Sequence, residues 1–291
     1  MRVRVIATVS VLLLAGCQSD SARARPASDD LGFAIAVGKP ANRIVSLNPA
    51  TTDLIFALGA GRRLVGRTHW DLYPDSARLV PDLGPGLRPN IEAVIGTHPD
   101  LVLLYASQDN RAAATALRAA GINTVSLRID HIADFHRAAR LIGRLVGDSA
   151  RGVMVSDSVK RTLLRVRAAT ASFETPTVFW HIWDSPLITI GRGSYMNELV
   201  EIAGGANIYS DMPGASPTVS IEDVLRRNPD FIIDGPEGAR KIDHDPKWSS
   251  LGAVKAGRVL VVDTAIVGRP SVRLGEAAVS IANLLHPGAI R

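Results

Sequence analysis

The chain has 291 residues, a formal net charge of +5 and a single cysteine, and 46% of its residues are hydrophobic. One cysteine excludes an internal disulfide, and without a lysine- or arginine-rich block nothing supports nucleic-acid binding. This length exceeds one typical hydrophobic core, so we expect two lobes.

The N-terminus has the features of a secretory signal. Arg2 and Arg4 precede an apolar run over 5–16, which is shorter than the roughly 20 apolar residues that span a bilayer. Small residues end the run just before Cys17, a pattern similar to the lipobox of bacterial lipoproteins, in which the cysteine is acylated. We therefore expect a lipoprotein signal peptide over 1–16 and lipidation at Cys17, which would anchor the protein to a bacterial membrane in the periplasm or at the cell surface. The alternative is an ordinary signal peptide with an incidental cysteine.

The remainder divides into a tether and three folded parts. Loss of residues 1–16 removes two arginines and no acid, so the formal charge falls from +5 to +3. Small polar residues open the next segment and predict a structureless tether. The predicted boundaries are the tether at 17–41, an N-terminal α/β lobe at 42–147, an interlobe helix at 148–173 and a C-terminal α/β lobe at 174–291.

Short β-branched runs alternate with amphipathic stretches through both lobes. In the first lobe we expect strands at 43–47, 64–66, 101–105 and 124–127, and helices at 51–58, 91–97 and 110–120. In the second lobe we expect strands at 177–180, 187–190, 231–234 and 258–263, and helices at 194–203, 221–227 and 273–285. This order is typical of mostly parallel sheets covered by helices.

A long helix is predicted between the lobes. Residues 148–173 contain no proline and one early glycine, Gly152, and apolar residues recur at helical spacing after a capping candidate, Asp148. A flexible hinge would instead be rich in glycine, serine or proline. We therefore expect little movement of one lobe relative to the other.

Two segments of the chain share a pattern. Residues 91–105 and 221–234 each read I-E-x-V, then four residues, then P-D and an apolar strand. The distance of 130 residues between them suggests two equivalent lobes rather than a solenoid. The alternative is a chance likeness of two helix–turn–strand units.

Glu92 and Glu222 occupy the same place in the two segments, in the first turn of each predicted helix and just after the capping candidates Asn90 and Ser220. A single carboxylate there stabilises the helix dipole. Two of them on equivalent elements predict a pair of acidic contacts for one partner, for example with arginines.

Several aromatic residues lie where strands are predicted to end. Because ligands bind at the carboxyl ends of parallel strands, we expect these rings to face a cleft between the lobes and to hold a large, partly apolar ligand. Ordinary packing is the alternative for each ring, and Trp248 is expected at the surface or against a helix. The cleft candidates are Trp70, Tyr73, Tyr105, Trp180 and Trp183.

The sequence contains no recognisable catalytic or metal-binding motif. Its seven histidines are scattered, and only His69 and His181 fall in the expected cleft loops. Arg192 lies in a Gly-x-Gly segment that lacks the further glycine and lysine of a phosphate loop. We therefore expect neither an enzyme, nor a resident cofactor, nor a bound metal.

Several stretches together resemble one known family. They are RIVSLNPATTDLIFALGAGRRLVG, the loop ending in DLYP, PNIEAVIGTHPDLVLL, SYMNELVEIAGGANI and IEDVLRRNPDFII. These resemble, in the same order, the helical-backbone (class III) substrate-binding proteins of ABC importers, which carry cobalamin, haem or ferric siderophores. The resemblance implies two Rossmann-like lobes bridged by a long helix, a small-molecule ligand and a monomer that delivers it to a permease. It also implies that Glu92 and Glu222, which match the family's docking glutamates, meet permease arginines.

The ligand is less well defined by the resemblance. The position of the aromatic residues favours cobalamin or another corrinoid, although a tryptophan of the cobalamin binders is missing from the loop 81–86. That loop also lacks the tyrosine common among haem binders. Ferric siderophores usually meet arginines, for which the candidates are Arg67, Arg88, Arg192 and Arg269. A secreted two-lobed enzyme is the alternative of another class.

Overall fold

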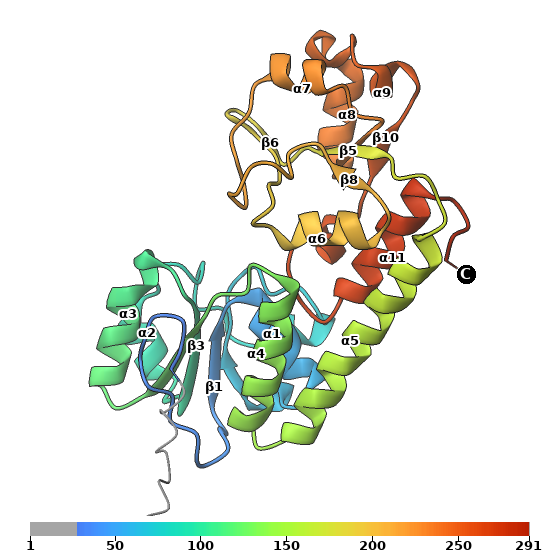
Figure 1. Ribbon diagram of the computed structural model, residues 1–291. Helices are drawn as coiled ribbons and strands as arrows, with labels where there is room; N and C mark the ends of the chain where they lie inside the picture. Colours follow the sequence, from blue (N-terminus) through green and yellow to red (C-terminus); the bar gives the residue numbers. More distant parts are fainter. Residues whose placement is uncertain (1–27, 291) are drawn as a thin grey trace, which may run out of the picture.

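A computed structural model describes residues 28–290 and shows two α/β lobes joined along one side by a single long helix (Figure 1). The predicted signal peptide and Cys17 lie outside these residues. Within 28–290, no helix is both long enough and apolar enough to cross a membrane.

The N-terminal lobe is a four-stranded parallel sheet in the order β2-β1-β3-β4. Helices α2 and α3 pack on one face of it, and α1 and α4 pack on the other (Figure 1). The elements are β1 (Ile44–Leu47), α1 (Pro49–Ala57), β2 (Leu64–Gly66), α2 (Ile91–Gly96), β3 (Leu101–Tyr105), α3 (Gln108–Ala119), β4 (Asn123–Leu127) and α4 (Ile132–Leu145).

The C-terminal lobe is built on a second parallel sheet, in the order β10-β9-β5-β8, with a small antiparallel hairpin of β6 and β7 beside it. Its elements are β5 (Thr177–Trp180), β6 (Trp183–Asp184), β7 (Leu187–Ile188), α6 (Tyr195–Ile202), β8 (Ala206–Asn207), α7 (Ile221–Arg227), β9 (Phe231–Asp234), α8 (Pro236–His244), α9 (Gly252–Lys255), β10 (Val259–Val261), α10 (Thr264–Val267) and α11 (Leu274–Leu285). The expected strand at 187–190 is therefore shorter than predicted, and it pairs with β6 instead of joining the main sheet.

The two lobes have the same topology. When β1, β2, β3 and β4 are matched with β5, β8, β9 and β10, the two sheet orders are identical. The two repeated segments, α2–β3 and α7–β9, occupy matching positions in them.

The aspartate of each Pro-Asp turn makes equivalent contacts. Asp100 accepts hydrogen bonds from the backbone N–H groups of Asn42 and Arg43, before β1. Asp230 accepts from the backbone N–H of Thr177, the first residue of β5. Each carboxylate thus accepts hydrogen bonds from backbone N–H groups at the start of the neighbouring strand. This shared role explains why the sequence pattern recurs.

The expected tether at 17–41 is too long, because residues 28–41 pack on the N-terminal lobe. Asp29 is buried, and its carboxylate accepts hydrogen bonds from the N–H groups of Phe33 and Ser126. Leu31 and Ile35 join two of the hydrophobic clusters. This part of the predicted tether covers the edge of the sheet at β4.

The interlobe helix α5 (Ser149–Thr170) begins at Asp148, whose side chain caps it as the sequence indicated. Its buried apolar residues, among them Val159 and Leu163, belong to one hydrophobic cluster that also contains Leu54 and Ile142 of the N-terminal lobe and Ile281 of α11. The core therefore continues from one lobe into the other along α5.

The helices α4 and α5 approach closely at a pair of glycines. A Cβ atom added at Gly152 would lie 2.8 Å from the carbonyl oxygen of Ala139 and 3.1 Å from the Cα of Gly143. The single glycine early in the long helix is therefore a packing requirement rather than a flexible point.

We predict that Gly152→Ala destabilises the protein by about 1–3 kcal/mol, because the overpacking at α4 outweighs the roughly 1 kcal/mol that alanine gains in a helix. Gly96→Ala is the matched control, since nothing lies within 4 Å of its added Cβ. Urea unfolding followed by circular dichroism measures both. A Gly152→Ala protein as stable as the control would contradict the close approach.

Candidate functional site

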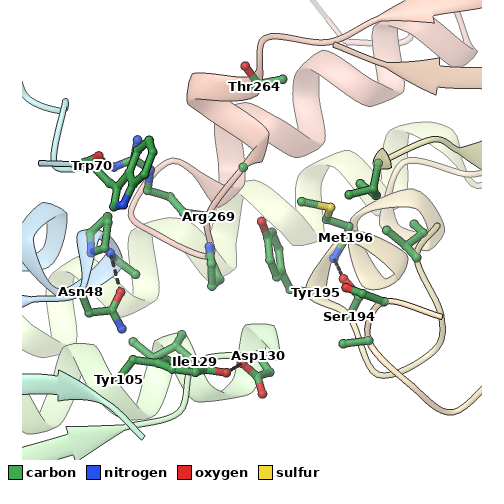
Figure 2. A pocket seen from close by; sticks show the side chains of 18 of the residues that line it. Asn48, Trp70, Tyr105, Ile129, Asp130, Ser194, Tyr195, Met196, Thr264 and Arg269 are labelled. Carbon is green, nitrogen blue, oxygen red and sulfur yellow. Dashed lines mark hydrogen bonds between the residues drawn. The ribbon is translucent and has the colours of Figure 1, made fainter. Parts of the chain in front are cut away.

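A cavity of about 690 Å³ lies between the lobes, at the carboxyl ends of their strands (Figure 2). Parallel strands of one sheet end at the same edge, so their following loops meet there. From the N-terminal lobe the wall is formed by Asn48, Pro49, Ala50, Trp70, Leu72, Tyr105, Ile129 and Asp130. From the C-terminal lobe it is formed by Ile182, Ile190, Ser194, Tyr195, Met196, Ala215, Ser216, Thr264, Ala265, Gly268, Arg269 and Pro270.

Local capping geometry positions several of these residues. Asn48 follows β1 and caps α1 by accepting from the N–H of Ala50. Ser194 caps α6 in the same way, through the N–H of Met196. The residues beside the two caps, including Tyr195, therefore face each other across the cavity (Figure 2).

Three aromatic rings line the cavity. Trp70 is 60% exposed, and its indole packs edge-on against the ring of His69 at 4.4 Å. Tyr105 ends β3, and Tyr195 begins α6 on the opposite wall. Figure 2 shows the three rings on different sides of the same space. Such an arrangement suits a large ligand with flat apolar faces.

Both tyrosine hydroxyls already have partners. Tyr105 donates to Asp130 at 2.8 Å, and burial first, then this carboxylate, raise the pKa of Tyr105 to about 12. Tyr195 donates to the carbonyl oxygen of Val267 at 2.8 Å, and burial raises the pKa of Tyr195 as well. Both phenols are therefore held in the protonated form at neutral pH.

Only two of the lining residues carry a formal charge, Asp130 and Arg269. The guanidinium of Arg269 lies 3.8 Å from the Oδ1 atom of Asp53, which is buried beneath the cavity wall in α1. It also donates to the carbonyl oxygen of Trp70 at 3.5 Å. Arg269 therefore connects the C-terminal lobe to two N-terminal elements.

Further contacts join the lobes beside the cavity. The N–H of Tyr195 donates to the carbonyl oxygen of Asp130 at 2.8 Å, and the next residue, His131, contacts Glu198 at 2.7 Å. On the Arg269 side, the guanidinium of Arg273 lies over the ring of Tyr73 at 4.7 Å. The lobes thus touch on two sides of the cavity.

A second cavity, of about 720 Å³, lies in the C-terminal lobe. It shares Ile182 and Thr264 with the first cavity, so the two hollows adjoin. Trp183 of the β6–β7 hairpin is on its wall and is 61% exposed. On the same wall, the buried ring of His181 contacts Asp234 at 2.5 Å and Asp184 at 3.1 Å.

The structure brings some of the predicted ligand contacts together and separates others. Trp70, Tyr105 and Arg269 meet on the first cavity, whereas Trp183 and His181 lie on the second. Tyr195 was missed by sequence reasoning, although the serine cap before it marks a helix start at the cleft.

Three expectations need correction. Trp180 is 2% exposed, because its side chain faces the interlobe core, so it does not reach the cavity. Arg192 is exposed and belongs to neither cavity. For Trp248 only the surface alternative is wrong: it is 1% exposed, its ring lies 5.8 Å from that of Phe179, and it shares a hydrophobic cluster with Ile242 of α8, as expected for a residue that packs against a helix.

The other candidate residues have structural partners. Tyr73 lies under Arg273 and is not part of either cavity wall. Arg67 is buried and donates to the carbonyl oxygens of Ala77 and Thr68. Arg88 pairs with Asp109 at 2.5 Å. Among residues 28–290, no cluster of three or more metal-binding side chains forms.

Glu92 and Glu222 are both exposed in the first turns of α2 and α7, and Asn90 and Ser220 cap these helices as expected. A hydrogen bond from its own backbone N–H is the main reason that the pKa of Glu222 is lowered. The capping groups therefore leave both carboxylates accessible to a partner.

Comparison with known proteins gives a consistent result. The periplasmic binding protein family matches residues 44–265. An uncharacterised ABC transporter substrate-binding lipoprotein of Bacillus subtilis is 30% identical over 88% of this chain and 84% of its own length. A cobalamin-binding protein of Halobacterium salinarum is 29% identical over 89% of this chain and 73% of its own length. The apo structure of a periplasmic haem-binding protein of Roseiflexus has a TM-score of 0.74 at 22% identity, over 85% of this chain and 99% of its own, and it shows the likeness of the fold.

The positions of the tryptophans give a prediction on stability. Trp180→Ala and Trp248→Ala should each lower the free energy of unfolding by about 3–5 kcal/mol, because both remove a buried ring. Trp70→Ala and Trp183→Ala serve as matched surface variants and should change it by less than about 1 kcal/mol. Urea unfolding of the four proteins measures the difference, and equal losses in all four would contradict the assignment of core and cavity rings.

Proposed function

Because the chain belongs to the periplasmic binding protein family of ABC transporter substrate-binding proteins, we propose that it captures cobalamin or another corrinoid in the cavity between its lobes and delivers it to an ABC importer. Members of this family bind small ligands and pair with permeases. The fold and the relatives favour this role over that of a secreted enzyme, and in residues 28–290 the cavity holds no nucleophile–base pair.

The aromatic character of the cavity carries the proposal. Trp70, Tyr105 and Tyr195 offer flat faces to a macrocycle, and the net charge of Asp130 and Arg269 together is zero. A large ligand with mostly uncharged polar edges fits such a wall. The relative named as a cobalamin-binding protein supports the same ligand class.

Haem and ferric siderophores are the alternatives within the family. A tyrosine ligand to iron would have to lose its proton, and the raised pKa values of both cavity tyrosines oppose that loss. A siderophore site rich in arginines is opposed by the positions of Arg67, Arg88 and Arg192, which lie away from the wall. Arg269 is the one remaining candidate of that set.

Titration with a ligand panel tests the proposal. Cyanocobalamin, dicyanocobinamide, haemin and several ferric siderophores are added to the purified protein, and tryptophan fluorescence and melting temperature are followed. We expect a corrinoid to quench the fluorescence and to give the largest stabilisation. A larger effect of a siderophore or haemin would identify that compound as the ligand in place of a corrinoid. If no compound of the panel had an effect, the proposed role would be contradicted.

Ligand contact by the exposed tryptophans is part of the proposal. Trp70→Ala should weaken corrinoid binding by about 1–3 kcal/mol. Trp183→Ala should do the same only for a ligand that extends into the second cavity, so cyanocobalamin should be affected more than the smaller dicyanocobinamide. Unchanged affinity of both variants would remove the two rings from the site.

Docking through Glu92 and Glu222 is the proposed route to the importer. Both acids are exposed on equivalent helices of two lobes that share one core, which holds their separation nearly constant. Paired charges of this kind fix the orientation of a complex and speed its formation. The permease is the partner that two arginine contacts would fit.

We predict that the double variant Glu92→Ala and Glu222→Ala abolishes uptake in cells and leaves the affinity for free ligand unchanged. Lysine at either position should be worse than alanine, because it adds repulsion. Glu174→Ala is the matched control, since this glutamate is exposed between α5 and β5. Normal uptake by the double variant would return both residues to helix stabilisation alone.

Anchoring through a lipid on Cys17 is also proposed, on the signal-like N-terminus and the relative named as a lipoprotein. Cys17→Ser should release the protein from the membrane fraction without changing ligand affinity. Membrane association of this variant, measured by fractionation and immunoblotting, would contradict the lipoprotein interpretation.

A further inference from the structure

Beneath the cavity wall, α1 carries a carboxylate that the proposed function does not use. Asp53 is 1% exposed, and neither of its carboxylate oxygens accepts a hydrogen bond. An unpaired buried carboxylate is costly, so a residue of this kind calls for an explanation. Its nearest ion-pair partner is Arg269, at 3.8 Å, which belongs to the other lobe and lines the cavity.

We propose that Asp53 is the buried counter-charge of Arg269, and that its gain or loss of a proton sets the charge that the cavity presents to a ligand. When Asp53 is ionised, the pair is neutral and Arg269 has little attraction for an anion. When Asp53 is protonated, Arg269 loses its nearest counter-charge and presents more positive charge to the cavity. This inference rests on the proposed function only in taking the cavity as the ligand site.

The charged groups around Asp53 come from three elements. Asp71, in the loop after β2, opposes ionisation of Asp53, while Arg269, after α10, and Arg273, at the start of α11, favour it. The hydroxyl of Ser271 lies close by and also favours the ionised form, although it makes no hydrogen bond with the carboxylate. Burial outweighs these groups and raises the pKa of Asp53 to about 7.

A second buried carboxylate, that of Asp71, also interacts with Arg269. It is fully buried, one of its oxygens accepts from the N–H of Thr68 at 2.5 Å, and the other has no partner. Burial raises the pKa of Asp71 too. Two buried carboxylates near one arginine therefore leave one of them readily protonated near neutral pH.

Because the pKa of Asp53 is raised to about 7, the charge near Arg269 changes around neutral pH. Below about pH 7 Asp53 is protonated and Arg269 is free to meet a carboxylate of the ligand. Above it the ion pair forms and the attraction is lost. A ligand bearing carboxylates should therefore bind more tightly in mildly acidic conditions, whereas one bearing amides should bind equally well at both pH values.

A matched pair of corrinoids tests this selectivity. Dicyanocobinamide carries amides where dicyanocobyrinic acid carries carboxylates, and the affinity of each is measured by calorimetry between pH 6 and pH 8. For the natural protein, we expect the ratio of acid to amide affinity to fall about fivefold or more as the pH rises. In Asp53→Asn the ratio of acid to amide affinity should be high at every pH between 6 and 8. In Arg269→Gln this ratio should be low at every pH in the same range.

A second measurement needs no ligand. A raised pKa in the folded protein means that Asp53 favours folding at low pH and that this contribution is lost as the pH rises from about 4 to about 7. The melting temperature of Asp53→Asn minus that of the natural protein should therefore increase as the pH rises through this range. Above about pH 7 this difference should stay constant. Asp75→Asn, an exposed aspartate in the same lobe, is the control and should show no such gain.

The outcomes distinguish a failure of the inference about Asp53 from a failure of the proposed function. If no corrinoid binds, the proposed function fails, and the melting curves alone decide whether Asp53 titrates as inferred. A pH-independent difference between Asp53→Asn and the natural protein would overturn the inference. The same pH slope of the affinity ratio in Asp53→Asn and the natural protein would also overturn it.

Discussion

The packing of α5 against both lobes is the constraint on which the rest of the structure depends. Its buried face belongs to a hydrophobic cluster that runs from α1 and α4 through to α6 and α11. At Gly143 and Gly152 the helices α4 and α5 lie too close together to leave room for a larger side chain. One shared core is expected to keep the two cavity walls in a nearly fixed relation, so the proposed ligand site would be largely preformed and its ordering would cost little free energy on binding.

The cavity combines this fixed frame with a wall of few charges. Two tyrosines, whose hydroxyls already have hydrogen-bond partners, and an exposed tryptophan offer surface to the apolar faces of a ligand. The guanidinium of Arg269 lies against the carboxylate of Asp53. Because the arginine also bridges the lobes, ligand chemistry and interlobe contact meet at one side chain. A ligand that recruits Arg269 would weaken its pairing with Asp53, so recognition would be coupled to this contact between the lobes.

Most of the fold could be predicted from local patterns, and the limits have physical causes. The capping residues Asp148, Asn90 and Ser220 are all confirmed, since a cap depends on its own helix. The helix α4 was not predicted, although Ile132, Phe135, Ala139 and Ile142 recur at helical spacing on its buried side.

For the site, the rule that ligands collect at strand ends led to Trp70 and Tyr105 but could not assign individual rings. Trp180 and Trp183 are three residues apart, yet one is in the core and the other is exposed, because the chain turns into a hairpin between them. The link between Asp53 and Arg269 joins residues more than 200 positions apart, and no local pattern reveals such a pair.

A crystal structure of the protein bound to the corrinoid with the highest affinity is the most direct test of ligand binding between the lobes. We predict that the macrocycle lies between the lobes, with its faces against Trp70 and Tyr195 and its edge near Arg269. A corrinoid bound elsewhere on the surface, with the interlobe cavity filled only by solvent, would contradict it.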